Sequence, residues 1–177
     1  MRVFYACFKK RVRSYFRLIL LVQLLISGGL AAYSQTPEEL RKQADLLFEQ
    51  GKFVEATPLY SKILAQQPRD YDVNFRYGTC LLYNSHNKEE AIRYLSYSVK
   101  GTDVDKRAYY YLGRAYHLNY QFNEAIGQYE KFKSVANPTQ VKSLEVDQQI
   151  LACKNGKKLL SNVTDMIVIQ KTEIRAE

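Results

Sequence analysis

The stretch KFVEATPLY at residues 52–60 recurs as NKEEAIRYL at residues 87–95 and as QFNEAIGQY at residues 121–129. Each copy has an alanine at its fifth position and a Tyr or Leu four residues further on: Ala56 and Tyr60, Ala91 and Leu95, Ala125 and Tyr129. A second series of small residues keeps intervals of 34 and then 35 residues: Ala44, Gly78 and Gly113. A repeat of this period indicates an array of similar supersecondary units. The period therefore predicts how the chain is built, and it does not say what the chain binds.

The first copy has the pattern of two helices joined by a tight turn. Pro37 suits the first position of a helix, and Thr36 with Glu39 forms a capping box around it. Apolar residues follow at helical spacing as far as Gly51, which supplies the turn, and a second helical pattern ends before Pro68. We expect three such helix pairs, at about residues 37–70, 71–105 and 106–139. One inserted residue in the second turn, at residues 84–87, explains why the two series of intervals differ by one.

The sequence after the third copy predicts a capping helix and then a change of structure. Residues 140–161 carry a loose apolar stripe among polar residues, as expected of a helix that covers the end of a helical array. A fourth repeat is the alternative, but no alanine followed by an aromatic residue comes at the right distance. Residues 162–177 include the β-branched run Val163–Ile169, which predicts a strand. Because a lone strand is unstable, we expect this β-prone tail to begin a truncated downstream domain of a longer protein.

The first 34 residues have the three parts of an export signal peptide. A basic flank is followed by the apolar run Leu18–Ile26, and Ala32-Tyr33-Ser34 places small residues before Gln35. The run is shorter than the roughly 20 residues that a membrane-spanning helix needs, so we expect cleavage after Ser34. The long basic flank favours the alternative, an uncleaved anchor, which would be the chain's attachment to a membrane. In either case we expect an exported protein, periplasmic or associated with the outer membrane.

The net charge indicates which partners to expect, and the cysteines indicate whether a disulfide forms. The chain of 177 residues has a net charge of +8, and removal of the six cations in the signal leaves +2. Because phosphate binding needs a dense basic patch, we expect no nucleic acid partner.

Cys80 and Cys153 both lie in helical apolar patterns of the mature part. We therefore expect two buried free thiols, although an oxidising compartment would also permit a disulfide between them.

The repeat resembles the tetratricopeptide repeat, a helix-turn-helix unit of about 34 residues. In each copy a small residue precedes a large one by three positions: Ala44 and Leu47, Gly78 and Leu81, Gly113 and Tyr116. The second copy departs from the family at Asn74, where an aromatic residue is usual, and at Asp103, which replaces a proline. The resemblance covers residues 37–139. It implies an all-α fold, a superhelix of three repeats with a C-terminal capping helix and the short β-prone tail.

In this family the first helices of the repeats line a concave groove that holds an extended peptide or a partner helix. By helical phase, the groove-facing candidates are Arg41, Asp45, Phe48, Phe75, Thr79, Leu82, Tyr83, Tyr110, Arg114 and His117. The set mixes aromatic rings with charges, as protein-binding surfaces do. Helical phase cannot separate the groove from contacts between helices, so each residue can instead cover a neighbouring helix. The family's clamp for acidic C-termini uses Lys and Asn, which this set lacks, so a chaperone-adaptor role is not expected.

The wider layout is similar to that of bacterial envelope proteins. In those proteins an export signal, three repeats and a capping helix with an Ala-Cys pair (here Ala152-Cys153) precede a β-propeller and a peptidoglycan-binding domain of the outer-membrane protein A type. Some of them serve gliding motility or type IX secretion, but this chain has neither downstream domain. The resemblance implies a non-enzymatic scaffold of the cell envelope that binds a protein partner in its groove. The alternatives are a module that positions a missing propeller or cell-wall domain, and a regulatory arm of a downstream enzyme.

The sequence predicts no catalytic, cofactor or metal site. His86 in the second turn and His117 at the end of a first helix have no Cys, Asp or second His at the spacing of metal ligands. No nucleophile motif and no glycine-rich phosphate loop occurs. The paired acids Glu38-Glu39 and Glu89-Glu90 lie in first helical turns, where they complement the helix dipole. We therefore expect no enzyme activity, no cofactor and no small-molecule substrate.

Overall fold

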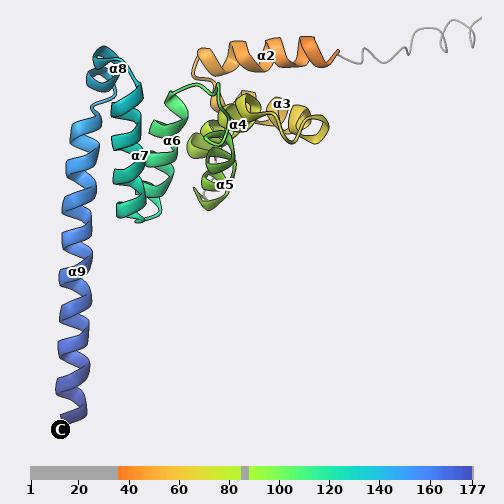
Figure 1. Ribbon diagram of the computed structural model, residues 1–177. Helices are drawn as coiled ribbons and strands as arrows, with labels where there is room; N and C mark the ends of the chain where they lie inside the picture. The colour runs from red at the N-terminus through yellow and green to blue at the C-terminus, as the bar shows by residue number, and fades with distance from the viewer. Residues whose placement is uncertain (1–35, 85–87, 177) are drawn as a thin grey trace, which may run out of the picture. The chain divides into compact units, whose positions relative to one another are not determined.

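The computed structural model describes residues 36–84 and 88–176, with side chains as far as Met166 apart from Asp165 (Figure 1). The predicted export signal at residues 1–34 and the inserted turn with His86 lie outside the described residues. Eight helices make up the described chain: α2 (Pro37–Glu49), α3 (Phe53–Gln66), α4 (Tyr71–Asn84), α5 (Lys88–Ser98), α6 (Arg107–Leu118), α7 (Phe122–Val135), α8 (Pro138–Ser143) and α9 (Val146–Ala176). The predicted all-α fold is confirmed.

Three helix pairs stack in chain order, as the repeat predicts. Helices α2 and α3, α4 and α5, and α6 and α7 pack as pairs, and each second helix also packs against the first helix of the next pair. The small residues allow this close packing. A Cβ atom added at Gly78 would lie 2.8 Å from Cγ of Leu95, and one at Gly113 would lie 2.8 Å from the ring of Tyr129. The marker residues are therefore the points where the two helices of a pair touch.

The hydrophobic core follows the stack in two clusters. The larger extends from α2 to α6 and includes Tyr60, Phe75 and Leu95, whereas the smaller joins Tyr110 of α6 to α7 and α9. The two described cysteines are buried free thiols, as predicted, with Cys80 in the larger cluster. Burial raises the pKa of the Cys80 thiol to about 12. The thiol is therefore protonated at neutral pH and packs as a small apolar group.

The first and third turns share one backbone geometry. Gly51 has a φ of 72° and Tyr120 a φ of 60°, so both lie in the left-handed region. In each turn the N–H of this residue donates to the carbonyl three residues earlier, and the following N–H donates to the carbonyl five residues before it. Glycine adopts this conformation without strain, whereas tyrosine does so at a cost of roughly 1–2 kcal/mol. The third turn therefore stores strain that the first does not.

The C-terminal cap consists of two helices in place of the single helix predicted at residues 140–161. Asn137 caps the short helix α8 through a complete capping box, and Glu145, with a φ of 50°, separates α8 from α9. Helix α9 packs on α7 through the buried side chains of Val146 and Ile150. Further along α9, a Cβ atom at Gly156 would lie 2.6 Å from the ring of Phe122. Helix α9 thus covers the exposed side of the last helix pair.

The prediction of a β-prone tail at residues 162–177 is wrong, because α9 continues as a helix to Ala176. The described residues contain no strand with which an extended tail could pair, whereas a helix bonds its backbone groups internally. The layout of propeller-bearing envelope proteins includes a β-rich segment after the capping helix, and this chain has the helix α9 at that position. Past Gly156 the side chains of Leu159, Val163 and Met166 are exposed. In residues 36–84 and 88–176 no helix has both the length and the apolar composition that crossing a membrane requires.

Candidate protein-binding face

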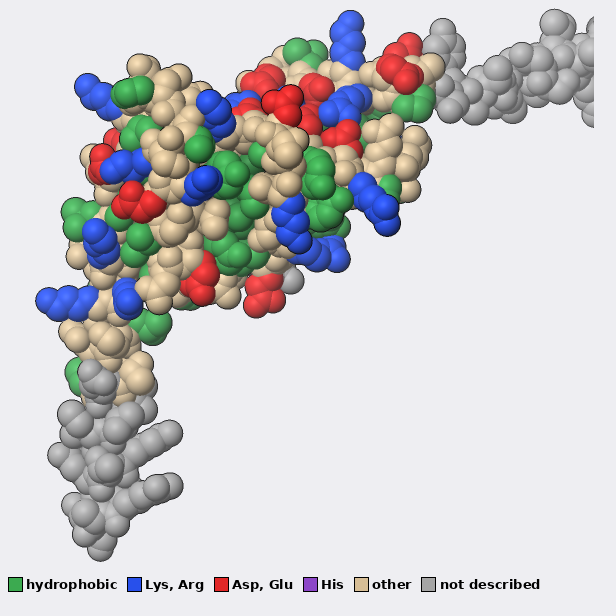
Figure 2. Space-filling view, in the orientation of Figure 1, with side chains coloured by type: hydrophobic (Ala, Val, Ile, Leu, Met, Phe, Trp, Pro, Cys, Tyr) green, Lys and Arg blue, Asp and Glu red, His purple; other side chains and the backbone are tan. Residues whose placement is uncertain are grey.

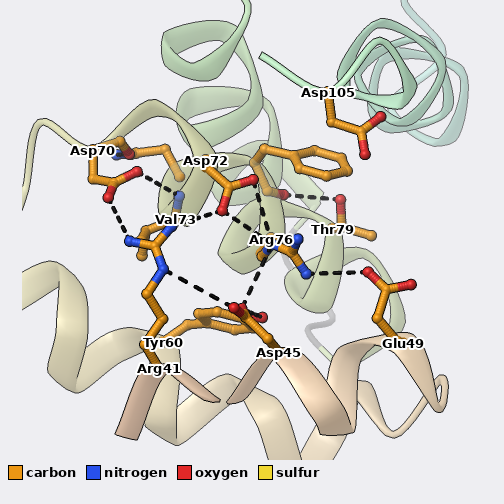
Figure 3. Close-up of polar contacts among 12 residues, drawn as sticks. Arg41, Asp45, Glu49, Tyr60, Asp70, Asp72, Val73, Arg76, Thr79 and Asp105 are labelled. Carbon is orange, nitrogen blue, oxygen red and sulfur yellow. Dashed lines mark hydrogen bonds and ion pairs between the residues drawn. The ribbon is translucent and has the colours of Figure 1, made fainter. Parts of the chain in front are cut away.

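Helices α2, α4 and α6 carry a network of charged side chains, which we call the charge ladder. It consists of Arg41, Asp45, Glu49, Asp72, Arg76 and Arg107 on these helices, with Asp70 and Asp105 just before α4 and α6. Figure 3 shows all of these side chains except Arg107. Acidic and basic side chains adjoin on the surface over α2 and the start of α4 (Figure 2). The ladder connects all three first helices, and we call the exposed surface of α2, α4 and α6 the first-helix face.

Arg41 joins the first repeat to the beginning of the second. Its guanidinium donates to Asp70 at 2.6 Å and to Asp72 at 2.8 Å. The other carboxylate oxygen of Asp70 accepts the backbone N–H of Val73 at 3.0 Å and so caps α4. Burial alone would raise the pKa of Asp70, but the N–H of Val73 and the guanidinium of Arg41 lower it below its usual value. The ionised form of Asp70 therefore stabilises the contact between the two repeats.

Arg76 occupies the centre of the ladder and is the most buried of its arginines, with a side chain 17% exposed. It pairs with Asp72 at 3.1 Å and Glu49 at 3.2 Å, and it lies 3.6 Å from Asp45. Burial opposes its charge, but the carboxylates of Asp72 and Asp45 help to outweigh burial and raise the pKa of Arg76. Asp45 in turn accepts a hydrogen bond of 2.7 Å from the hydroxyl of Tyr60, whose pKa burial and Asp45 both raise. The core tyrosine and the ladder are therefore one polar network.

Arg107 extends the ladder to the third repeat. It pairs with Asp105 at 2.7 Å and with Glu49 at 3.7 Å, and its guanidinium lies 5.9 Å from the centre of the Phe75 ring. Each of the three ladder arginines thus has at least two carboxylate partners. Because the charges are paired, the ladder fixes the spacing of the first helices.

A second group of side chains lies at the start of α3, at the end of α4 and on α6. We call these residues, Phe53, Tyr83, Arg114 and His117, the Tyr83–Arg114 patch. The ring of Tyr83 is 44% exposed and stacks on Phe53 with 4.3 Å between ring centres. Arg114 donates a 3.0 Å hydrogen bond to the Tyr83 hydroxyl and lies 5.6 Å from the centre of its ring. His117 is half-buried, and burial together with Arg114 lowers its pKa. At neutral pH Arg114 is therefore the charged group of the patch.

The ten residues predicted by helical phase divide into two groups of equal size. Five are partly exposed or exposed: Arg41, Asp45, Tyr83, Arg114 and His117. Five are buried: Phe48, Phe75, Thr79, Leu82 and Tyr110. The buried residues lie where the first helices meet their neighbours; Phe48, for example, packs against Tyr60 and Phe75. Their side chains pack in the core beneath the exposed residues of the face and are not accessible to a partner.

Helical phase missed most of the charge ladder. Glu49 and Arg107 lie at the ends of their helices, and Asp70 and Asp105 lie in the segments that precede α4 and α6. Their pairing depends on distances between repeats, which one sequence does not contain. One signal was available, because Asp70 and Asp105 occupy equivalent positions 35 residues apart in successive copies. A search for recurrent acids at repeat boundaries would have found both.

The described residues form shallow hollows but no cluster of metal-ligating side chains. They contain no group of three or more His, Cys, Asp or Glu side chains placed to hold a metal ion. A hollow of about 350 Å³ lies away from the first-helix face, among α7, α8 and α9, and Lys133, Val141 and Asp147 are among the residues that line it. The chemistry that the face offers is charge pairing, hydrogen bonding and ring stacking.

Three stacked helix pairs, with a charged and aromatic face on their first helices, define an α-helical repeat protein. The model of the tetratricopeptide repeat family matches residues 41–84 and 80–139, which is more than half of the chain. The chain belongs to the tetratricopeptide repeat family, a family of interaction scaffolds. No curated protein matches the chain in sequence.

Solved structures of low sequence identity share the fold. A crystal structure of MamA is 22% identical with a TM-score of 0.59, covering 73% of this chain and 68% of that one. The type III secretion chaperone SycD of Yersinia enterocolitica, solved with a peptide of the translocator YopD, is 20% identical with a TM-score of 0.57, covering 72% and 98%. The TPR2B domain of yeast Sti1, in complex with pHsp70, is 18% identical with a TM-score of 0.55, covering 69% and 98%.

Proposed function

We propose that this protein is a non-enzymatic scaffold that binds a segment of a partner protein on its first-helix face, with the Tyr83–Arg114 patch at the centre of contact. One observation carries the proposal. Arg114 is half-buried beside an exposed aromatic ring and has no carboxylate partner among the described residues, whereas the ladder arginines are all paired. An aromatic ring with an adjacent arginine is the composition typical of the residues that dominate binding energy at protein interfaces.

The charge ladder supports the proposal because it holds the first helices in place before a partner binds. Its ion pairs cross from α2 to α4 and from α2 to α6. A surface that is already ordered loses less conformational entropy on binding, which leaves more of the interaction energy as affinity. The ladder would then position the patch, and the patch would make the contact.

The structural neighbours support the same kind of partner. SycD was solved with a peptide of YopD, and the Sti1 domain in complex with pHsp70. These proteins share the fold with this chain at identities of 20% and 18%, so they favour a protein partner in general and name none.

A pair of double variants tests the binding face. Tyr83→Ala with Arg114→Ala removes the exposed ring and the guanidinium that has no carboxylate partner among the described residues. Val54→Ala with Arg93→Ala is the matched control, because it removes an exposed apolar group and an exposed guanidinium from the second helices α3 and α5. Purified proteins immobilised on beads are incubated with extract of the source cells, and bound proteins are identified by mass spectrometry. We expect the control to retain the proteins captured by wild type and the patch variant to lose them, with unchanged helicity and melting temperature. Equal capture by both variants would exclude the patch.

We also propose that the protein acts in the bacterial cell envelope, either in the periplasm or at the outer membrane. The proposal is based on the basic flank, short apolar run and small residues of positions 1–34. N-terminal sequencing of the protein from fractionated cells tests it. A periplasmic form beginning at Gln35 is the expected result, and an intact form in the membrane fraction would show an uncleaved anchor instead. An intact form in the cytoplasm would contradict export.

A second candidate function is a module that positions another domain or protein through α9. This helix continues past its contact with Phe122 to Ala176, and Leu159, Val163 and Met166 are exposed along it. Truncation after Lys157 separates the two functions, because it leaves the contact between α7 and α9 intact. If the truncated protein captures the same partners, the first-helix face acts as the binding site. If capture is lost while wild-type stability is kept, α9 carries the interaction.

A further inference from the structure

We infer that the segment bound on the first-helix face carries an acidic side chain in its interior, and that the carboxylate of this side chain binds Arg114. The inference rests on the proposed function and goes beyond it by stating the chemistry of the partner. It commits to an internal Asp or Glu of a protein segment, positioned next to the exposed ring of Tyr83.

The arginines of the face differ in whether they have carboxylate partners. Arg41, Arg76 and Arg107 each have two or more carboxylates of this chain within 4.0 Å. Arg114 has the hydroxyl and the ring of Tyr83 as partners, and no ion pair to it occurs in the described part of the chain. A guanidinium presents five N–H donors in a planar fork that fits a carboxylate. The hydrogen bond to Tyr83 uses one of its nitrogens, so donors remain for a ligand.

Beside Arg114 lies one exposed hydrogen-bonding group that a partner can reach, the hydroxyl of Tyr83. The Tyr83 hydroxyl accepts from Arg114 and can donate its own proton to an anion. The hydroxyl of Tyr129 is fully buried and has no hydrogen-bond partner in the structure. Burial raises the pKa of both Tyr110 and Tyr129, and Arg114 opposes this rise at both, at Tyr110 also through a side-chain hydrogen bond. Glu145, on the segment before α9, acts on Tyr110 and forms no ion pair with Arg114.

The rest of the face disfavours an acidic group, because carboxylates outnumber guanidiniums in the charge ladder. The charge ladder has five carboxylates and three guanidiniums, so α2 and the start of α4 carry an excess of negative charge. Glu49, with a side chain 55% exposed, is the most exposed of these carboxylates. An acidic residue of the partner is therefore favoured at Arg114 on α6 and disfavoured over α2. Charge complementarity selects both the kind of residue and its place on the face.

A selection with displayed peptides tests the inference without a known partner. The probe is a phage-displayed library of random linear peptides, fused to the coat protein at their C-termini so that no free terminal carboxylate is present. The wild-type protein from Gln35 onward, Tyr83→Ala, Arg114→Gln and Arg114→Glu are used as baits. Arg93→Glu is the matched control, because it makes the same change of charge at an exposed arginine on α5. Circular dichroism and melting temperature establish that each bait is folded.

We expect peptides selected by wild type and by the Arg93→Glu protein to be enriched in Asp or Glu at one position next to an apolar or aromatic residue. The Arg114→Glu protein is expected to select Lys or Arg at that position, and Arg114→Gln neither. A selected acidic peptide is expected to bind the Arg114→Gln protein at least about tenfold more weakly than wild type, the loss of one hydrogen-bonded charge pair.

Failure of the inference and failure of the proposed function give different results. If peptides are selected and the Tyr83→Ala protein loses them, but acidic residues are not enriched, the face binds proteins and the inference about Arg114 is overturned. If no peptide is selected above background by any bait, both are overturned. If the acidic enrichment is the same with Arg114→Glu as with wild type, the anion is bound elsewhere and the inference fails.

Discussion

The carboxylate of Glu49, the last residue of α2, lies 3.7 Å from the guanidinium of Arg107, the first residue of α6. The two residues belong to the first and third repeats, and the helix between them, α4, contributes Arg76 to the same carboxylate at 3.2 Å. Glu49 is therefore a point at which three repeats meet. A repeat array is otherwise stabilised between nearest neighbours, so this contact adds a constraint over a longer distance.

Removal of Arg76 is expected to destabilise the array, because it leaves Asp45, Glu49 and Asp72 close together without their shared cation. We expect Arg76→Ala to lower the free energy of unfolding by about 2 kcal/mol. Chemical denaturation followed by circular dichroism measures the change. Arg93→Ala is the control, since Arg93 is 70% exposed and its pair with Glu90 contributes at most about 0.5 kcal/mol. Equal effects of the two changes would show that the ladder contributes nothing to stability.

The pair between Arg41 and Asp70 is expected to make stability depend on pH in the acid range. The folded state lowers the pKa of Asp70, so the contribution is complete above the unfolded pKa of about 3.9 and is lost as pH falls through the folded value. Asp70→Asn keeps an oxygen that can accept the N–H of Val73 but removes the charge. We expect the free energy of unfolding of wild type to exceed that of this variant by about 1 kcal/mol near pH 6. This difference in the free energy of unfolding is expected to shrink below about pH 4. A constant difference over this range would contradict the account.

The glycines at the helix contacts are expected to be required for packing. Gly78→Ala would place a Cβ 2.8 Å from Cγ of Leu95 and 3.2 Å from the backbone N of that residue, so α4 and α5 would have to move apart. We expect a loss of about 1–3 kcal/mol in the free energy of unfolding. Gly127→Ala on α7 is the matched change, because nothing lies within 4 Å of the new Cβ. That variant is expected to gain about 0.5–1 kcal/mol from helix propensity. Similar changes in the free energy of unfolding for the two variants would show that the close approach of α4 and α5 at Gly78 does not require glycine.

The strained turn between α6 and α7 is expected to be a site of stabilisation. Tyr120 has a φ of 60° and is 74% exposed, so Tyr120→Gly relieves backbone strain while little packing is lost. We expect the free energy of unfolding to rise by about 0.5–1 kcal/mol. Asn119→Gly is the control, since Asn119 has a φ of −100° and no strain to relieve. A lower stability of the Tyr120→Gly protein would show that the side chain contributes more than the strain costs.

The architecture of the repeats could be predicted from the sequence because the contacts that define it recur. Ala56, Ala91 and Ala125 are each completely buried between the helices of a pair, and their spacing reports the period directly. The tail could not be predicted in the same way. Its β-branched residues favour strands, but strand formation depends on a partner strand. Residues 36–84 and 88–176 contain none, and α9 continues there as a helix.

The candidate face could be predicted only in part. Helical phase included Tyr83 and Arg114, whose hydroxyl and guanidinium lie 3.0 Å apart at the surface. It also included Phe75 and Tyr110, which are buried because a first helix contacts neighbours over much of its circumference. The ladder was missed because Glu49 and Arg107 are 58 residues apart, and a pair so distant follows from the superhelical arrangement of the repeats rather than from local pattern.

Site-specific photo-crosslinking in the source cells tests the binding role of the first-helix face most directly. A photoreactive phenylalanine analogue is placed at position 83 on the first-helix face and, separately, at position 54 on α3, where Val54 is 60% exposed. The account predicts a discrete crosslinked protein from position 83 that is absent from position 54 and is lost when Arg114→Glu is combined with the position 83 probe. A crosslinked protein from position 54 but not from position 83, or one that is indifferent to Arg114, would contradict it.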